Sequence, residues 1–209
     1  MRLRITFAKV GPLRYTGHLD LHRLWERAAR RAELPLAYSQ GFHPQPKLTI
    51  AAALPLGFSS RCEVLDMRLE QEIALEGLRE KLQETLPTGI QVTSVETVDE
   101  KLPALQTLVA SAEYQVTLTD SSSSLRVDSV ELKRRVDSVL ASESIVRERR
   151  GKTYDLRPLI EELGLAQDGT IFMRLAAREG ATGRPEEVLD ILGIAFEETR
   201  IERTKLIFT

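Results

Sequence analysis

The sequence has 209 residues, of which 42% are apolar and 29% charged, and its formal net charge is −2. These values describe an ordinary globular protein of one large domain or two small ones, without a global attraction to nucleic acid. The single cysteine, Cys62, excludes an internal disulfide and a cysteine cluster for zinc or iron–sulfur, and it suits a reducing compartment. No apolar run approaches the roughly 18 residues of a membrane span, so we expect a cytoplasmic protein without membrane attachment.

The first half of the sequence predicts the order strand, helix, two strands, helix, strand. Alternating apolar and polar residues predict an opening strand over 1–9 instead of a signal peptide. Apolar residues at helical spacing predict a first helix over 18–32 and a second over 72–86. The other predicted strands are 36–38, 47–56, 61–69 and 90–98, and the apolar run 47–56 predicts a strand covered on both faces. This order is the ferredoxin-like βαββαβ plan with one extra short strand.

Residues 99–109 predict a linker, because charged residues and a proline interrupt any periodic pattern. The order of elements then repeats over 110–209, although the letters do not. The predicted strands are 110–119, 144–150, 152–155, 170–177 and 195–208, the predicted helices are 128–140 and 185–192, an extra helical turn is predicted over 156–163, and the serines at 121–124 predict a loop tip. We therefore expect an α+β protein with two ferredoxin-like halves, 1–98 and 110–209, each with an antiparallel sheet and its helices on one face.

The most distinctive segment is the loop over 39–47. Its glycine can adopt positive φ, and its two prolines fix their own backbone angles and restrict the residues before them. Two interpretations of Phe42 stay open: it fills the core, or it is a binding group on a rigid loop. For His43 and Lys47 we favour a function, because stiff loops commonly carry binding groups. We expect both side chains near the mouth of a polar cleft that the start of the first helix, around His18, also reaches.

Candidate catalytic groups are few. His18, His22 and His43 are the only histidines, and histidine moves protons at neutral pH. His18 and His22 share a helix face, but the sequence offers no further ligand beside them, so no metal site and no cofactor are predicted. An RNA-cleaving site would combine His18 or His43 as the acid–base group with a cation that stabilises charge on the phosphate, chosen from Lys47, Arg14 and Arg157.

Binding to RNA asks for less than cleavage. Residues 1–50 contain nine Lys or Arg and three Asp or Glu, and nine minus three gives a local charge of +6. Such a field attracts phosphate, and aromatic rings stack on unpaired bases. The alternative is that the arginines form a solvated helix face, and that the cations over 147–157 form a charged hairpin edge that blocks aggregation. The predicted RNA-binding residues are Arg14, Arg27, Arg30, Arg31, Phe42, His43, Lys47, Lys152 and Arg157.

Several short segments carry a resemblance to a known family. They are 17–20, Arg27 with 30–31, 39–44 with 46–47, 54–57 with Glu63, and Lys152 with 155–158. Residues 1–70 above all resemble the radical-SAM-linked family of bacterial proteins, in which this domain is found beside or fused to a radical SAM enzyme. The resemblance implies such an enzyme as partner. Genes for ribosomal proteins and an endoribonuclease near those of the family imply an RNA context, with ribosomal or transfer RNA as candidates.

A weaker similarity, of architecture only, is to the CRISPR RNA-processing endonucleases. Those proteins pair two ferredoxin-like halves, bind RNA on a basic face and often use a histidine near the first helix. Fold alone does not establish function.

Radical SAM chemistry needs three thiolates to hold its [4Fe–4S] cluster, and this sequence has one cysteine. We therefore expect an accessory protein that binds RNA, or presents a substrate, for a radical SAM enzyme in RNA modification or processing. Two alternatives remain: a metal-independent endoribonuclease that uses a histidine as general acid or base, and a protein–protein adaptor without RNA contact.

Overall fold

The computed structural model describes residues 1–119, 129–149 and 151–209. Over these ranges the protein is a mixed α+β structure with four α-helices and strands that pair mostly antiparallel. Contacts divide the chain into two compact parts, unit 1 (Met1–Val109 with Thr209) and unit 2 (Ala110–Phe208). The predicted serine loop at 121–124 lies outside the described residues, as do Asp128 and Arg150 at the ends of two predicted elements. None of the described helices combines the length and the apolar character needed to cross a membrane.

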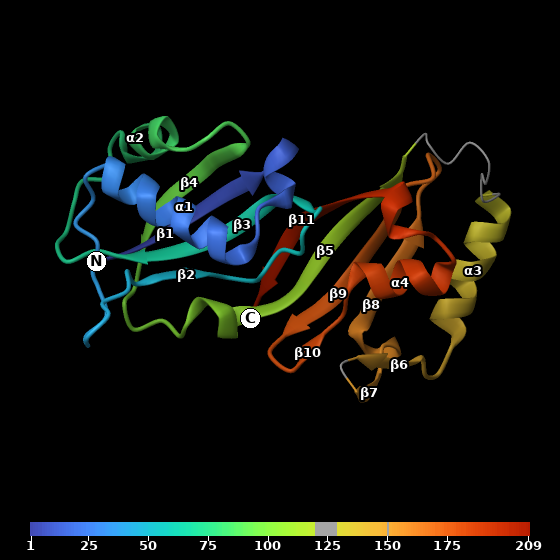
Figure 1. Cartoon of the computed structure of the whole chain (residues 1–209). Helices are drawn as coiled ribbons and strands as arrows, with labels where there is room; N and C mark the ends of the chain where they lie inside the picture. Colours follow the sequence, from blue (N-terminus) through green and yellow to red (C-terminus); the bar gives the residue numbers. More distant parts are fainter. Residues whose placement is uncertain (120–128, 150) are drawn as a thin grey trace. The chain divides into compact units, whose positions relative to one another are not determined.

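Unit 1 has the element order βαββαβ, which agrees with the predicted order (Figure 1). Its elements are β1 (Arg2–Lys9), α1 (His18–Arg31), β2 (Leu48–Ile50), β3 (Ser59–Arg68), α2 (Leu78–Thr85) and β4 (Ile90–Val98), with the short 3-10 helices η1 (Gly11–Tyr15) and η2 (Leu105–Leu108). The strands lie in the order β4-β1-β3-β2, and each neighbouring pair is antiparallel.

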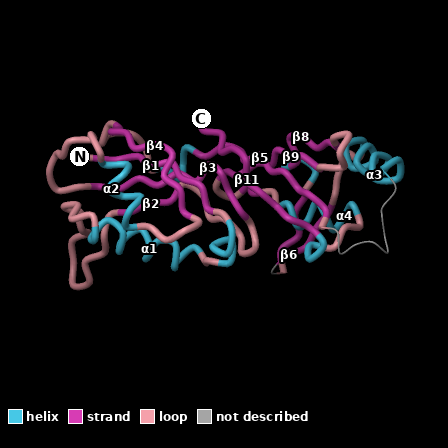
Figure 2. The backbone as a smooth tube through the Cα atoms, turned by 90° about the horizontal axis from the view of Figure 1, so that it is seen from above, coloured by secondary structure: helices cyan, strands magenta, loops and turns pink. Residues whose placement is uncertain are grey.

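Both helices of unit 1 cover the same face of its sheet (Figure 2). The alternation along β1 turns Leu3, Ile5 and Phe7 toward this face, where they pack with residues of α1 and α2. Trp25 of α1 is 0% exposed, and its ring meets that of Phe7 edge-on with 4.8 Å between ring centroids. The indole N–H of Trp25 is buried without a hydrogen-bond partner among the described residues.

The opposite face of the unit 1 sheet carries a buried ion cluster. Asp66 lies directly across from Arg4 in the β1–β3 ladder. Arg2 donates to Oδ2 of Asp66 through Nε and Nη2, at 2.9 and 2.6 Å, and Arg4 donates to Oδ1 through Nε at 2.9 Å. Arg2 also donates to the backbone carbonyls of Leu102 and Pro103, at 2.8 and 3.0 Å, so the segment after β4 is attached to this face. The Asp66 carboxylate raises the pKa of Arg4.

Three predicted boundaries in unit 1 are wrong. The strand predicted over 47–56 is only the three-residue edge strand β2, and residues after it form bends and turns. The strand predicted over 36–38 consists of two isolated bridges. The second helix begins at Leu78 and not at residue 72, because Gly77 before it adopts a left-handed conformation with φ of 70°.

Unit 2 contains two helices and seven strands in the described residues. They are β5 (Val109–Leu118), α3 (Ser129–Ala141), β6 (Val146–Arg149), β7 (Lys152–Asp155), β8 (Ile160–Leu165), β9 (Ile171–Arg178), β10 (Ala181–Thr182), α4 (Pro185–Leu192) and β11 (Thr199–Phe208), with the 3-10 helices η4 (Arg157–Leu159) and η5 (Phe196–Glu198). β9 pairs with β5 along one edge and with β8 and β10 along the other, and β11 pairs with β5. β6 and β7 form a separate two-stranded hairpin, and α3 packs against β8 and α4.

The helical turn predicted over 156–163 is wrong for most of its length. Only the 3-10 helix η4 is helical, and the strand β8 follows it. The closing strand also begins at Thr199, after η5, and not at residue 195. The helix α4 is confirmed with its predicted bounds, and it has a proline at its first position and Gly193 as its C-cap with φ of 70°.

Candidate functional site

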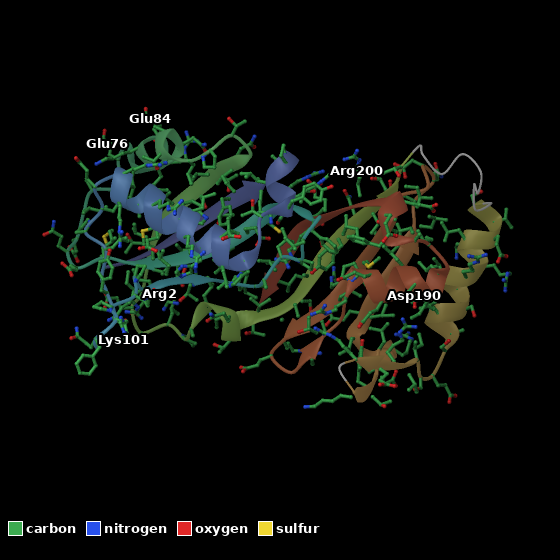
Figure 3. The ribbon with its side chains drawn as sticks, viewed as in Figure 1. Arg2, Glu76, Glu84, Lys101, Asp190 and Arg200 are labelled. Carbon is green, nitrogen blue, oxygen red and sulfur yellow. The ribbon has the colours of Figure 1, made fainter. Side chains whose placement is uncertain are left out.

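A groove runs along one side of α1 and has a volume of 540 Å³. Arg23, Arg27 and Arg31 line it at a spacing of four, which places them on one stripe of the helix. The end of α2 and the turn after it form the other wall, and Figure 3 labels Glu84 on this helix. We call this feature the α1 groove.

The charges of the α1 groove are only partly balanced. Asp20 lies 3.6 Å from Arg23, but both side chains are 68% exposed, so solvent screens the pair. The side chains of Arg27 and Arg31 have no hydrogen bond or ion pair among the described residues. Two guanidinium groups of the groove are thus available to an anionic ligand.

Arg30 has a different role from the other arginines of α1. Its guanidinium lies 2.7 Å from Glu26 and donates through Nε and Nη2 to the hydroxyl of Tyr38, at 3.3 and 3.2 Å. The hydrogen bond to Tyr38, and next to it the charge of Glu26, raise the pKa of Arg30. Arg30 therefore attaches the last turn of α1 to the base of the loop over 39–47.

The loop over 39–47 is closed at its base and exposed at its tip. Tyr38 and Pro46 form a β-bridge, and Ser39 and Gln45 exchange two hydrogen bonds, from the Ser39 N–H to the Gln45 carbonyl at 2.8 Å and from the Gln45 N–H to the Ser39 hydroxyl at 2.9 Å. Phe42 at the tip is 102% exposed. The interpretation of Phe42 as a core residue is therefore wrong, and the loop presents its ring to solvent.

Lys47 and His43 do not share a cleft with His18, and that expectation is wrong. Leu48 and Ile50 of β2 belong to the core under α1, so the alternation of the strand turns Lys47 and Thr49 to the opposite face. There Lys47 lines a separate cavity of 300 Å³ with Arg2, Asp66 and Arg68.

The loop of His43 follows the C-terminal end of α1, whereas His18 is the first residue of that helix. Fourteen residues of helix span about 20 Å. The ring Nε2 of His22 lies 3.2 Å from the Leu48 carbonyl oxygen, and the described residues contain no group of three His, Cys, Asp or Glu side chains that could hold a metal. His18 and the loop of His43 thus lie at opposite ends of α1, and Lys47 lines a cavity on the other face of the sheet.

The remaining predicted residues are not among those that line the α1 groove. The Arg14 guanidinium lies 4.8 Å from the ring centroid of Tyr15 and donates to its hydroxyl at 2.9 Å. Arg157 donates to the backbone carbonyls of Leu140 and Ile160, both at 3.0 Å, so it holds the fold of unit 2 together. Lys152 is exposed on β7.

Arg23 was missing from the predicted set although the sequence contains the signal. Its spacing of four from Arg27, and of eight from Arg31, indicates a single stripe on a helix that was itself predicted. Arg30 stands three residues after Arg27 and breaks that spacing, which agrees with its separate contact to Tyr38.

A family model described as an uncharacterized protein conserved in bacteria matches residues 2–185. No curated protein matches the chain.

Proposed function

The chain belongs to this family of uncharacterized proteins conserved in bacteria, and from that premise we propose that it binds RNA through unit 1. The bound RNA is presented to a radical SAM enzyme, in RNA modification or processing. The partner rests on the sequence resemblance of residues 1–70 alone, and the RNA rests on the chemistry of α1 and of the loop that follows it.

The single observation that carries the proposal is the pair of unpartnered guanidinium groups, Arg27 and Arg31, in the α1 groove. Arginine donates in a planar fork that fits phosphate oxygens, so it binds phosphate with directional hydrogen bonds. A stripe of arginines spaced by four residues, about 6 Å along the helix axis, offers contacts to successive phosphates. The carboxylates of Asp20 and Glu84 at the groove restrict this role to a few contacts.

The loop over 39–47 supports binding to an unpaired stretch of RNA. A phenylalanine ring that is fully exposed on a closed loop is a surface on which a base can stack. The hydrogen bonds of Ser39 and the Arg30–Tyr38 contact hold the loop before any ligand arrives, which lowers the ordering cost of binding. One helix therefore lines the groove with one side and braces the aromatic loop with its last turn.

We also infer that each unit is a ferredoxin-like half. The strand order β4-β1-β3-β2 in unit 1 and the order β11-β5-β9-β8 in unit 2 support this inference, since each corresponds to a βαββαβ arrangement. In unit 2 the hairpin β6–β7 would then be an insertion between the first helix and the second strand of the plan.

The test of the RNA proposal is a triple substitution of Arg23, Arg27 and Arg31 to glutamine. RNA affinity is expected to fall, and the slope of log affinity against log salt is expected to decrease by about two, because each lost phosphate contact removes about 0.7 from the slope for single strands. Fluorescence anisotropy of a labelled, mixed-sequence single-stranded RNA over a series of salt concentrations measures both quantities.

The matched control for this experiment removes the same charge elsewhere in unit 1. Arg79, Lys81 and Lys101 are exposed and lie outside the α1 groove, so their triple substitution to glutamine should leave most of the affinity. If both triple variants lost the same RNA affinity, the loss would be an effect of net charge and not of the α1 groove. A native protein that shows no RNA binding at low salt would contradict the proposed function itself.

Phe42→Ala is expected to weaken RNA binding by about 1–3 kcal/mol, the range for one stacked base. The free energy of unfolding should change by less than about 0.5 kcal/mol, because the ring is fully exposed and contacts no core. Phe42→Trp keeps a stacking surface and should retain affinity. A folded Phe42→Ala protein with unchanged affinity would remove the loop from the RNA site and leave only the groove.

A further inference from the structure

Unit 2 contains a pocket that the proposed RNA site does not use. Its volume is 540 Å³, within the range of about 300–1,000 Å³ that small-molecule sites occupy. Three segments form it: the hairpin β6–β7, the 3-10 helix η4 and the turn between β9 and β10. The lining residues used below are Arg149, Lys152, Tyr154, Asp155, Leu159 and Ala181, and we call this feature the hairpin pocket.

Two like charges stand directly opposite each other in the hairpin pocket. Arg149 and Lys152 are register partners in the β6–β7 ladder, so their side chains leave the same face. Neither side chain has a hydrogen bond or an ion pair among the described residues. Like charges at directly opposite positions destabilise a strand pair, and no carboxylate in the described part of the chain forms an ion pair with either of them.

Arg147 lies on the same face of the hairpin, but unlike Arg149 and Lys152 it has an acidic partner. It stands opposite Tyr154 in the register and forms an ion pair with Asp190 of α4, a residue labelled in Figure 3. Asp155 does line the pocket, but its Oδ1 already accepts hydrogen bonds from the backbone N–H groups of Ile145 and Arg157, at 2.8 and 2.9 Å. Those two bonds hold the pKa of Asp155 below its ordinary value.

The rest of the hairpin pocket is aromatic and apolar. Leu159 and Ala181 line it together with Tyr154. Burial, and next to it the Glu187 carboxylate, raise the pKa of Tyr154 to about 12, so its ring is neutral at physiological pH. A neutral ring beside two cations is suited to a ligand with an aromatic part and an anionic part.

We infer that the hairpin pocket binds a nucleoside 5′-phosphate. Arg149 and Lys152 bind the phosphate and so remove the repulsion between them, while Tyr154, Leu159 and Ala181 contact the base. A nucleoside 5′-phosphate occurs both as a free nucleotide and as the 5′-phosphorylated end of an RNA, and either could be the ligand of this pocket. The site stands on observations in unit 2, so it does not depend on the α1 groove.

The experiment titrates the full chain with AMP, adenosine and inorganic phosphate by isothermal titration calorimetry. AMP is expected to bind at one site per chain, more tightly than either of its parts. Lys152→Gln and Arg149→Gln should each weaken AMP about tenfold, the effect of one charged hydrogen bond. Lys205→Gln, which removes an exposed cation of β11 in the same unit, should leave AMP binding unchanged. Tyr154→Leu should weaken AMP and leave phosphate binding unaffected.

A second measurement needs no ligand. Lys152→Gln is expected to raise the unfolding temperature of the ligand-free protein, because it removes one of two opposed like charges, and AMP should raise that temperature in the native protein and less in the variant. If RNA with a 5′-phosphate displaces AMP and the same RNA with a 5′-hydroxyl does not, the hairpin pocket binds RNA ends. If neither RNA displaces AMP, the pocket binds free nucleotides. Absence of saturable AMP binding, equal binding of adenosine, or an equal loss in Lys205→Gln would overturn the proposal.

Discussion

Asp66→Ala is expected to lower the free energy of unfolding by about 3–5 kcal/mol, because it leaves a buried guanidinium without its counter-ion. Arg2 and Asp66 are each 4% exposed, and Asp66 accepts from Arg2 and Arg4 at distances of 2.6 to 3.0 Å. The same substitution weakens the attachment of the segment after β4, which Arg2 holds through the carbonyls of Leu102 and Pro103. Chemical denaturation followed by far-ultraviolet circular dichroism measures the loss.

Asp20→Ala is the control for Asp66→Ala. It also removes an aspartate that pairs with an arginine, but that pair is exposed and its atoms are 3.6 Å apart, so a change of 0–1 kcal/mol is expected. Asp66→Asn retains an acceptor for one guanidinium and should fall between the two. A loss below about 1 kcal/mol for Asp66→Ala would mean that Arg2 finds another partner or reaches water.

Trp25→Ala is expected to cost a similar amount, about 3–5 kcal/mol, for a different reason. The ring is fully buried between α1 and the sheet, and its edge-on contact with Phe7 is lost with it. Truncation of a large core ring removes its transfer free energy and leaves a cavity that the neighbours fill only in part. The same denaturation experiment gives the size of the loss.

Trp25→Phe distinguishes the contribution of the apolar ring to stability from that of the indole N–H. The indole N–H has no hydrogen-bond partner in the described residues, and a buried unsatisfied donor costs about 1–3 kcal/mol. Phenylalanine removes this cost while it keeps most of the apolar surface, so the substitution should destabilise by less than about 2 kcal/mol. A variant with phenylalanine as unstable as the one with alanine would contradict this expectation.

Where turn residues and periodicity agree, the sequence predicted the elements well. α1 was placed within one residue of its observed end, and α4 with its exact bounds, because each has apolar residues at helical spacing. Asp20 in the first turn of α1 and Pro185 at the start of α4 agree with these helix starts. The apolar run after Lys47 was misleading for the opposite reason. It contains alanines and a proline without alternation, and only Leu48–Ile50 pairs with β3.

The missed strand β8 has a specific physical cause. The β8–β9 ladder shifts register between Ile160 and Glu162, and Ile160 and Leu163 are both buried. Their spacing of three imitates the period of a helix, and the proline of η4 just before them adds to the helical signal. Periodicity alone cannot distinguish a strand with such a register shift from a helical turn.

The candidate site was predictable in residue type and only partly in placement. The spacing of Arg23, Arg27 and Arg31 contains the stripe on α1, but the predicted set included Arg30 and omitted Arg23. The alternation of Leu48 and Ile50 likewise places Lys47 on the opposite face of β2, although we expected it beside His18. The partners of Arg157 were not predictable, since the Leu140 carbonyl is brought to it by tertiary packing. The exposure of Phe42 was not predictable either, because it depends on the β-bridge at the base of the loop, and no local sequence pattern indicates that bridge.

Trp25 also gives the protein a built-in spectroscopic reporter. It is the only tryptophan of the chain, and it lies in the core of unit 1 without solvent contact. Its emission should therefore be blue-shifted in the folded protein and should move to the red when that core opens. Circular dichroism averages over both units, whereas this emission follows unit 1 alone. Coincident transitions by the two probes would indicate a single cooperative unfolding event, and separate transitions would give each unit its own midpoint.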